Sequence, residues 1–396
     1  MTVVLINNSQ ETYTPTRSGA IATWVWEVGR RLGGLGAEAL VLSRACEAAA
    51  YADVESALIP YPGEHAGRLG RLLGRLERKC FGYTAVGLRS YATRVVEVVR
   101  ARSLSRFPLV VHNDLELAVR LRHAFPNSTV VHHFHNQSAC KPRFLREVVP
   151  SGVRLSAVSD FTARWAERRL GLSSGSVTTV HNGVDADRFT PRAGIARRDR
   201  AVINFVGRTG IEKGPDLLLE AAKRLAAQGA RFDVQLLGSN YWHKFELDGY
   251  QRKLQTLASE LEDAGVRVRR PGHVPRADLP AEITRADIHV TPSRWDEPFG
   301  LVTLEGMACG LATVASRTGG TPEVVGDAGL MFERDDVGGL AAALGRLIDN
   351  PAERAALGRS ARRRAETFTW DATARGVLAV AGLEPARAVP SFALAH

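Results

Sequence analysis

Short runs of β-branched and apolar residues alternate along the chain with longer stretches whose apolar residues recur at helical spacing. This alternation is typical of parallel sheets covered by helices. The strand-like segment TVVLIN, a loop and a helical pattern over Gly19–Leu32 predict an opening of Rossmann type. Strands are expected in the first half at Val3–Asn7, Glu38–Ser43, Leu109–His112, Thr129–His133, Leu155–Val158 and Val177–His181.

A polar, arginine-rich passage at 191–200 interrupts this pattern, and a new strand pattern follows it. We therefore expect an α/β protein with two doubly wound domains, over 1–190 and 201–368, joined by a linker at 191–200. The segment 369–396 is expected to pack back on the N-terminal domain and to end in a disordered tail. In the second domain, strands are expected at 202–206, 232–237, 266–269, 287–291 and 312–315, and helices at 215–227, 249–263, 301–308, 337–348 and 351–367.

The bulk composition agrees with a globular protein of two domains. The chain has 396 residues, more than one hydrophobic core usually organises, and 45% of them are hydrophobic. The four cysteines form no CxxC pair, which predicts neither a zinc site nor a disulfide framework. No leader precedes the first strand and no run of about 18 apolar residues could span a bilayer, so a cytoplasmic protein is expected.

Basic residues exceed acidic ones and give a formal net charge of +10. Lys and Arg are dense between 69 and 106, where a basic helical face could contact the anionic inner face of a membrane. A solvated helix face explains the same pattern without a partner, and it is the favoured interpretation. Nucleic acid is not expected as a partner, because the sequence contains no zinc finger, RNP element or basic patch interleaved with aromatic residues.

A glycine-bearing turn at 207–214 (GRTGIEKG) follows an expected strand and leads into an expected helix. Gly207 lets the backbone turn tightly, the helix start offers amides, and the cations Arg208 and Lys213 can neutralise a diphosphate. The residue order differs from the P-loop pattern GxxxxGK[ST]. From the spacing alone, a turn with solvated cations is an equal alternative.

A second candidate site is the run from Glu297 to Glu305, which follows the expected strand at 287–291. Glu297 lies at the carboxyl edge of the sheet, where ligands of open α/β sheets bind, and Glu305 falls inside the next helix. The two carboxylates could accept hydrogen bonds from two sugars of one ligand, while amides near Gly300 could face negative oxygen. Carboxylates at a helix start also act as caps without a ligand, and spacing alone leaves this alternative open.

These segments resemble a known family. The run EPFGLVTLE is similar to the EX7E signature of the family 4 retaining glycosyltransferases, and the turn at 207–214 resembles their GR…KG element. The agreement covers most of residues 200–370 and extends more weakly to VSDFTAR (158–164) and HNGVDADRF (181–189). The resemblance implies the GT-B fold, in which two Rossmann-like domains face each other across a cleft.

The resemblance also implies how a donor is held. Arg208 and Lys213 would bind the donor diphosphate and act in catalysis with Glu297, which would hydrogen-bond hydroxyls of the transferred sugar. Glu305 would bind the ribose. A UDP-sugar is the favoured donor and a GDP-sugar the alternative, and no cofactor or metal is expected, because cations and amides stabilise the leaving diphosphate. The further donor-binding residues implied by these segments are Gly207, Gly272, His273, Val274, Phe299, Gly300 and Leu301.

In the first domain, the family places a histidine facing the donor sugar, and the run HHFHNQ (132–137) ends an expected strand. His135 is assigned this catalytic role, and a packed or surface histidine is the alternative. Asn136 beside it is a candidate acceptor-binding residue. The earlier strand ends in His112-Asn113-Asp114, another edge position that could touch an acceptor, so Asn113 is a second candidate.

Two further features bear on phosphate and metal binding. The family usually has a glycine pair in the first loop, where only Gly19 matches, and Gly19 is assigned to the donor site. Arg17 could supply an acceptor or phosphate contact, or be solvated. Asp185 and Asp187 match a metal-binding DxD motif, but their setting resembles the family's NGVD element, so a structural role is favoured.

The resemblance implies a hexosyltransferase-type enzyme that retains the anomeric configuration by a front-face route. The acceptor hydroxyl would belong to a glycan, a lipid-linked glycan or a natural product, and the sequence does not choose among them. Domain closure around the linker is the hypothesis for bringing His135 to the donor. A sugar-nucleotide epimerase or hydrolase on the same scaffold is the main alternative, because a fold does not fix a function.

Overall fold

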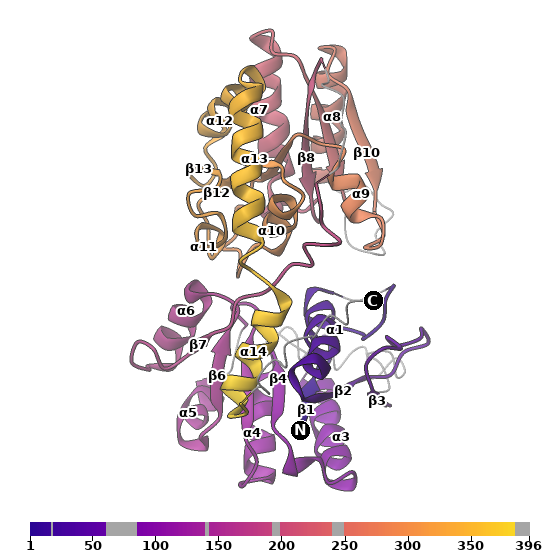
Figure 1. Cartoon of the computed structure of the whole chain (residues 1–396), viewed down its shortest axis with the longest axis vertical. Helices are drawn as coiled ribbons and strands as arrows, with labels where there is room; N and C mark the ends of the chain where they lie inside the picture. The colour runs from indigo at the N-terminus through magenta and orange to yellow at the C-terminus, as the bar shows by residue number, and fades with distance from the viewer. Residues whose placement is uncertain (17–18, 61–84, 139–141, 192–198, 240–248, 385–396) are drawn as a thin grey trace, which may run out of the picture. The chain divides into compact units, whose positions relative to one another are not determined.

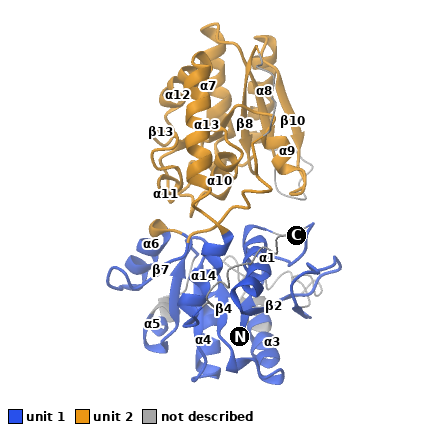
Figure 2. Cartoon of the chain, in the orientation of Figure 1, with its two compact units in different colours: residues 1–158, 162–180, 370–396 blue, residues 159–161, 181–369 orange. Residues whose placement is uncertain are grey.

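The computed structural model describes residues 1–16, 19–60, 85–138, 142–191, 199–239 and 249–384. The chain divides into two compact units, and each is described by itself (Figures 1 and 2). Unit 1 contains residues 1–158, 162–180 and 370–396, and unit 2 contains residues 159–161 and 181–369. Most of the expected linker, much of the basic region at 69–106, the expected tail and Arg17 lie outside the described residues.

Unit 1 is built on a seven-stranded parallel sheet in the order β3-β2-β1-β4-β5-β6-β7. All four residues from Val3 to Ile6 are fully buried, which is typical of a central parallel strand covered on both faces. The strands are β1 (Thr2–Ile6), β2 (Glu38–Arg44), β3 (Ser56–Ile59), β4 (Leu109–His112), β5 (Val130–Phe134), β6 (Arg154–Ala157) and β7 (Thr178–Thr179). The helices are α1 (Ala20–Leu32), α3 (Ala85–Ala101), α4 (Leu115–Ala124), α5 (Pro142–Ser151), α6 (Asp160–Leu170) and α14 (Trp370–Ala381).

Unit 2 repeats the scheme with a six-stranded parallel sheet in the order β10-β9-β8-β11-β12-β13. The strands are β8 (Ala201–Val206), β9 (Phe232–Leu237), β10 (Val268–Gly272), β11 (Ile288–Thr291), β12 (Ala312–Ser316) and β13 (Leu330–Phe332). The helices are α7 (Pro215–Ala227), α8 (Gly249–Asp263), α9 (Leu279–Ile283), α10 (Leu301–Ala308), α11 (Thr321–Val325), α12 (Val337–Asp349) and α13 (Pro351–Ala365), with a 3₁₀ turn, η3, at Ile211–Lys213. In both sheets the strand order runs outward from the first strand, as in a doubly wound fold.

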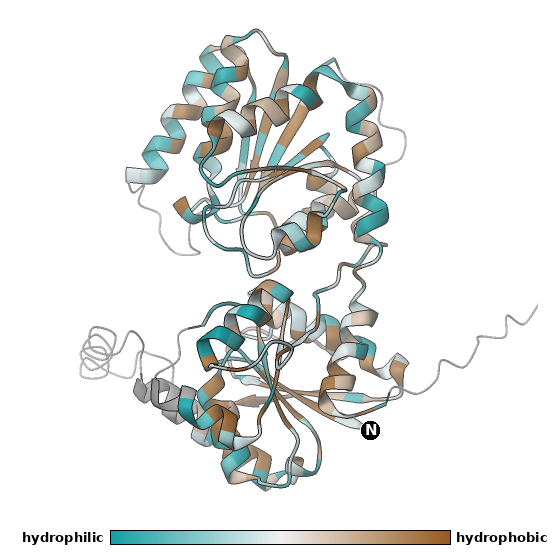
Figure 3. Ribbon diagram, turned by 90° about the vertical axis from the view of Figure 1, so that its left-hand side faces the viewer, coloured by the Kyte–Doolittle hydropathy of each residue, from teal (hydrophilic) through white to brown (hydrophobic). Residues whose placement is uncertain are grey.

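Each unit has its own hydrophobic core between its sheet and its helices. Figure 3 shows hydrophobic residues along the strands and both kinds of residue along the helices, because each helix buries only one face. The last helix, α14, packs against α1 in unit 1. Among the helices in the described part of the chain, none has both the length and the hydropathy needed to cross a membrane.

Candidate functional site

The carboxyl ends of β8 and β11 are neighbours at one edge of the unit 2 sheet, because the two strands pair in parallel. Gly207 follows β8 with φ +148°, and Gly238 follows β9 with φ +136°. A Cβ atom on Gly238 would lie 1.8 Å from the carbonyl oxygen of Gly207, so glycine is needed for this close approach. The turn at 207–214 therefore leaves the sheet edge where ligands of such folds bind.

Lys213 and Glu297 form the centre of the candidate site in unit 2. The Lys213 Nζ lies 2.6 Å from Glu297 Oε1, and the two side chains are 20% and 9% exposed. Ser293 Oγ donates a hydrogen bond to the same carboxylate oxygen, and the Lys213 ammonium lies 4.9 Å from the centre of the Trp295 ring. A cation and a carboxylate held side by side can meet a phosphate and a hydroxyl of one ligand.

A bidentate ion pair holds together the two loops that carry these residues. Arg294 Nη1 and Nη2 donate to the two carboxylate oxygens of Asp216 at 2.6 and 3.0 Å. The Arg294 amide donates to the carbonyl oxygen of Glu212 at 2.9 Å. Burial raises the pKa of the Asp216 carboxyl, but hydrogen bonds from its partners outweigh burial and bring this pKa to about 2. The carboxylate is therefore ionised at neutral pH, and the loops stay joined.

The helix α10 begins at the site without a capping side chain. Its N-cap, Gly300, has φ +100° and no side chain, so the first amides of α10 donate to no capping side chain. Phe299 is 2% exposed, and Gly320 packs against its backbone. Gly319 packs closely on the loop, since a Cβ atom there would lie 2.1 Å from the carbonyl oxygen of Glu297, which accepts the Gly320 amide at 2.7 Å. These contacts fix Glu297 beside a helix start that favours negative charge.

Two further expected donor-binding residues of unit 2, Glu305 and Arg208, also have partners of opposite charge. Glu305 on α10 is 1% exposed, and its Oε1 lies 2.9 Å from Arg276 Nη2. Arg208 Nη2 lies 3.4 Å from Glu212 Oε1. The expected donor-binding residues Gly272, His273 and Val274 cover the end of β10 and the loop that follows it. A ligand that used Lys213, Arg208 or Glu305 would therefore exchange an existing ion pair for its own contact.

In unit 1, three histidine rings pack around Trp24 of α1. The ring centroids of His112, His133 and His135 lie 4.8, 4.8 and 5.1 Å from that of the indole. His132 belongs to the other face of β5, as strand alternation predicts. Burial, and then the neighbouring imidazoles, lower the pKa of His112 and of His135 well below the usual value. The expected catalytic histidine thus belongs to a cluster of neutral rings.

The expected acceptor residues Asn113 and Asn136 contact each other, with Asn113 Nδ2 donating to Asn136 Oδ1 at 2.8 Å. At the start of α1, Glu11 Oε2 accepts the Ala22 amide at 2.8 Å, and burial raises the pKa of this carboxyl against the effect of its amide bonds. A Cβ atom on Gly19 would lie 2.4 Å from the Glu11 carboxyl carbon. The helix start next to the expected phosphate loop therefore holds a carboxylate of the chain itself.

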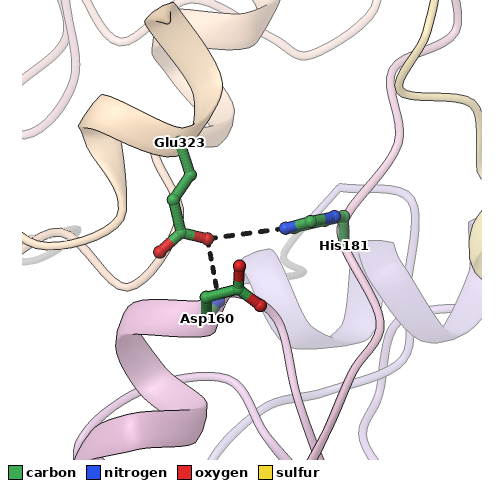
Figure 4. Close-up of side chains that lie close together, drawn as sticks. All are labelled: Asp160, His181 and Glu323. Carbon is green, nitrogen blue, oxygen red and sulfur yellow. Dashed lines mark hydrogen bonds and ion pairs between the residues drawn. The ribbon is translucent and has the colours of Figure 1, made fainter.

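Three titratable side chains of unit 2, Asp160, His181 and Glu323, lie close together (Figure 4). Glu323 accepts the amides of Asp160 and Phe161 at 2.8 and 2.6 Å, and His181 Nε2 lies 3.4 Å from the same carboxylate. The ligand atoms fall within 4.8 Å of one another, but the Glu323 carboxylate already accepts two backbone amides, as a capping carboxylate does. These contacts explain the cluster without a metal ion.

Unit 2 also contains a residue near the site that the sequence analysis missed. Thr321 is 1% exposed, and its hydroxyl has no hydrogen-bond partner within the described residues. A Cβ atom on Gly300 would lie 3.6 Å from this hydroxyl, which places Thr321 beside the start of α10. Thr321 begins the five-residue helix α11, which is too short to give a periodic signal, so Thr321 could be found only in the structure.

Asp185, from the DxD motif, accepts the Arg188 amide at 3.2 Å in a turn.

Two family models match the chain. The model described as "Glycosyltransferase Family 4" matches residues 21–188, and the one described as "Glycosyl transferases group 1" matches residues 187–364. The D-inositol 3-phosphate glycosyltransferase 2 of Catenulispora acidiphila is 37% identical over 241 residues, which are 58% of this chain and 55% of that protein. The D-inositol 3-phosphate glycosyltransferase of Salinispora arenicola is 29% identical over 411 residues, covering 92% of this chain and 87% of the relative.

Solved structures show the same architecture. The Anabaena protein HepE in complex with UDP has a TM-score of 0.71, is 18% identical, and is matched over 96% of this chain and 100% of its own. At this identity the likeness concerns the fold, and the expected GT-B fold class is confirmed. The family models together cover both units, and the candidate site lies on the expected sheet edge. The chain therefore belongs to glycosyltransferase family 4 and is an enzyme of the transferase class.

Proposed function

We propose that this enzyme transfers a sugar from a nucleoside diphosphate sugar, with a UDP-sugar as the favoured donor, to a hydroxyl of an acceptor, with retention of the anomeric configuration. The observation that carries the proposal is the arrangement of Lys213 and Glu297 beside the uncapped start of α10. A cation and free amides suit the diphosphate, and a carboxylate suits the sugar hydroxyls. One short stretch of the sheet edge thus matches both halves of such a donor.

The same groups give the proposal its chemistry. When the bond between the sugar and the diphosphate breaks, negative charge grows on the leaving phosphate oxygen. Lys213 and Arg208, after exchanging their carboxylate partners for the diphosphate, stabilise that charge together with the first amides of α10. In the proposed front-face route, the leaving phosphate helps to remove the proton of the attacking hydroxyl. In this proposal the two cations take the place of a divalent metal.

The proposal assigns supporting roles to unit 1. His135 would contact the transferred sugar, and Asn113 and Asn136 would contact the acceptor. HepE has been solved in complex with UDP-glucose, which supports a UDP-sugar as the first donor to test. Relatives that carry the name D-inositol 3-phosphate glycosyltransferase make D-inositol 3-phosphate the first acceptor to test. Glycan and lipid-linked hydroxyls are the other acceptors in the proposal.

Thermal unfolding in the presence of UDP-, GDP- and ADP-glucose tests the donor. Binding to the native state raises the unfolding temperature, and we expect the largest rise with UDP-glucose, unchanged by EDTA. A rise that disappears in EDTA would contradict the metal-free proposal. Release of nucleotide is then measured with and without acceptor, and the anomeric configuration of the product is read by proton NMR. Release that does not depend on any acceptor would favour a hydrolase.

A matched pair of variants ties the activity to the site. Glu297→Ala removes the carboxylate paired with Lys213, whereas Glu333→Ala removes a 71% exposed carboxylate of the same unit that pairs with Arg317. We expect transfer to be lost in the first variant and retained in the second. Equal transfer rates in the two variants would overturn the assignment of the site.

A further inference from the structure

Two histidines from neighbouring strands of unit 1 share a hydrogen bond. His112 is the last residue of β4, His135 follows β5 directly, and the two strands pair in parallel. His112 Nδ1 lies 3.0 Å from His135 Nε2, and His112 is 0% exposed while His135 is partly exposed. His112 is therefore a buried residue that contacts the expected catalytic ring directly.

The residue after His112 holds the backbone of the same loop. Asn113 has φ +56°, a conformation that asparagine tolerates better than most residues. Its Oδ1 accepts the His135 amide at 3.0 Å, and its Nδ2 donates to Asn136 Oδ1 at 2.8 Å. Two adjacent side chains at the end of β4 thus fix the ring and the backbone of His135.

The hydrogen bond between the rings links their protonation states. Two bare nitrogens 3.0 Å apart would repel, and two N–H groups would clash, so one proton lies between His112 Nδ1 and His135 Nε2. A neutral imidazole has one N–H and one bare nitrogen. Both rings therefore carry their proton on Nδ1, or both carry it on Nε2.

Burial decides between these two states. His112 Nε2 is buried without a hydrogen-bond partner in the described residues. If this atom carried the proton, the protein would bury an orphan donor, and orphan N–H groups are rarer in native proteins than unused acceptor positions. If both rings carry their proton on Nδ1, the buried His112 Nε2 is only an unused acceptor. In that state His112 donates to His135 Nε2, and His135 carries its proton on Nδ1.

We infer that His112 is a positioning residue that holds His135 in its Nδ1–H tautomer, so that His135 presents a hydrogen-bond donor at Nδ1. The role of that donor in transfer rests on the proposed function, whereas the tautomer does not. An N–H suits an oxygen of the donor sugar or of the diphosphate, both of which can accept. A bare nitrogen at the same place would act as a base, so His112 makes His135 a donor.

Nitrogen-15 NMR of the full-length chain labelled in histidine tests the tautomer directly. His135→Gln identifies the His135 signals by their loss. We expect a protonated Nδ1 and a bare Nε2 for His135 in the wild type and in His112→Asn, whose side-chain amide can still donate to Nε2. In His112→Phe this tautomer preference is expected to disappear. A protonated Nε2 in the wild-type His135 would overturn the inference even if no variant folds.

Kinetics separate positioning from general packing. One neutral hydrogen bond contributes about 0.5–1.5 kcal/mol, so His112→Phe should lower kcat by roughly 2- to 12-fold while the UDP affinity stays unchanged. His112→Asn should restore most of the loss. His132→Phe, a change at a buried histidine on the other face of β5, should leave the His135 tautomer and kcat unchanged. An equal loss in His132→Phe and His112→Phe would show a packing effect and refute a positioning role.

The two proposals can fail independently. If no acceptor supports transfer but the wild-type His135 carries its proton on Nδ1, the proposed function fails and the tautomer assignment stands. If transfer occurs and kcat is the same in His112→Phe as in the wild type, the positioning role fails and the proposed function stands.

Discussion

Lys213 Nζ and Glu297 Oε1 lie 2.6 Å apart although their residues are 84 positions apart in the chain. In this state the ammonium that is proposed to bind phosphate and the carboxylate that is proposed to bind sugar neutralise each other. A nucleotide without sugar competes for the lysine and gains nothing from the carboxylate. The two residues should therefore affect nucleotide binding and sugar transfer in different ways.

Glu297→Gln should lower the transfer rate by roughly 10- to 100-fold, since a hydrogen bond to a charged group contributes about 1.5–3 kcal/mol. The same change should leave the UDP affinity unchanged or make it tighter, because UDP lacks the sugar and Lys213 is released. Lys213→Ala should weaken UDP by roughly 10- to 100-fold for the same energetic reason. Calorimetric titration with UDP and initial rates of transfer measure the two effects. Weaker UDP binding in Glu297→Gln would contradict the division of roles.

Thr321→Val removes a buried hydroxyl that has no partner within the described residues and keeps the shape of the side chain. The free energy of unfolding should stay the same or rise by about 1 kcal/mol, because an unsatisfied buried hydroxyl is costly. The affinity for UDP should fall by roughly 2- to 12-fold if the hydroxyl bonds a phosphate oxygen. Denaturant unfolding and calorimetry give the two numbers. A variant that is more stable and binds UDP as well as the wild type would show that Thr321 does not face the ligand.

Gly319→Ala should disturb the Glu297 loop, because the new Cβ atom would lie 2.1 Å from the Glu297 carbonyl oxygen. Gly265→Ala is the matched control, since Gly265 also has positive φ but open space around its Cβ position. The control should cost about 1–2 kcal/mol in unfolding free energy for its backbone conformation alone. Gly319→Ala should cost about 1–3 kcal/mol more, and it should also lower transfer. An equal loss of unfolding free energy in the two variants would mean that the Glu297 loop adjusts to the new Cβ atom without a cost.

The buried histidines of unit 1 should make the protein sensitive to acid. Burial, with a smaller contribution from His133, lowers the pKa of His132 from its usual 6.5 to about 3. In the unfolded chain this histidine is protonated below about pH 6.5, whereas in the folded chain it stays neutral down to about pH 3. The free energy of unfolding is therefore highest above pH 6.5 and decreases as the pH falls below that value. At pH 5, protonation of this single histidine in the unfolded chain should lower the free energy of unfolding by on the order of 2 kcal/mol.

Urea unfolding at pH 7 and pH 5 measures this loss. His132→Leu should show a smaller difference between the two pH values than the wild type, because leucine cannot take up a proton. An unchanged difference would mean that His132 does not contribute to the acid sensitivity.

Much of the fold follows from local sequence pattern. The helices expected at 215–227, 249–263 and 301–308 have the expected bounds, because their apolar spacing and their glycine or proline starts agree. The strand β3 was missed because Ser56–Ile59 is short and mostly half-buried, so it shows neither alternation nor a continuous apolar run. The strand β13, with three residues, was missed for the same reason.

The candidate site was predictable as a set of residues and less so as a set of contacts. Lys213 and Glu297 were assigned from motifs to two parts of a ligand, and their mutual ion pair depends on the close approach of Gly319 and Gly320 to the loop. The contact between His112 and His135 depends on the register of β4 and β5, which no local pattern contains. The partner of His135 therefore follows from the pairing of β4 with β5 and not from the sequence motif that contains His135.

The helix α14 belongs to unit 1, although 189 consecutive residues of unit 2, from 181 to 369, separate it from the preceding part of that unit. During synthesis, the whole of unit 2 is therefore made after α1 and before its partner α14. Domains usually fold in order from the N-terminus. In this chain, unit 2 is complete in the sequence before unit 1 receives its last helix, so unit 1 is the unit that is completed last.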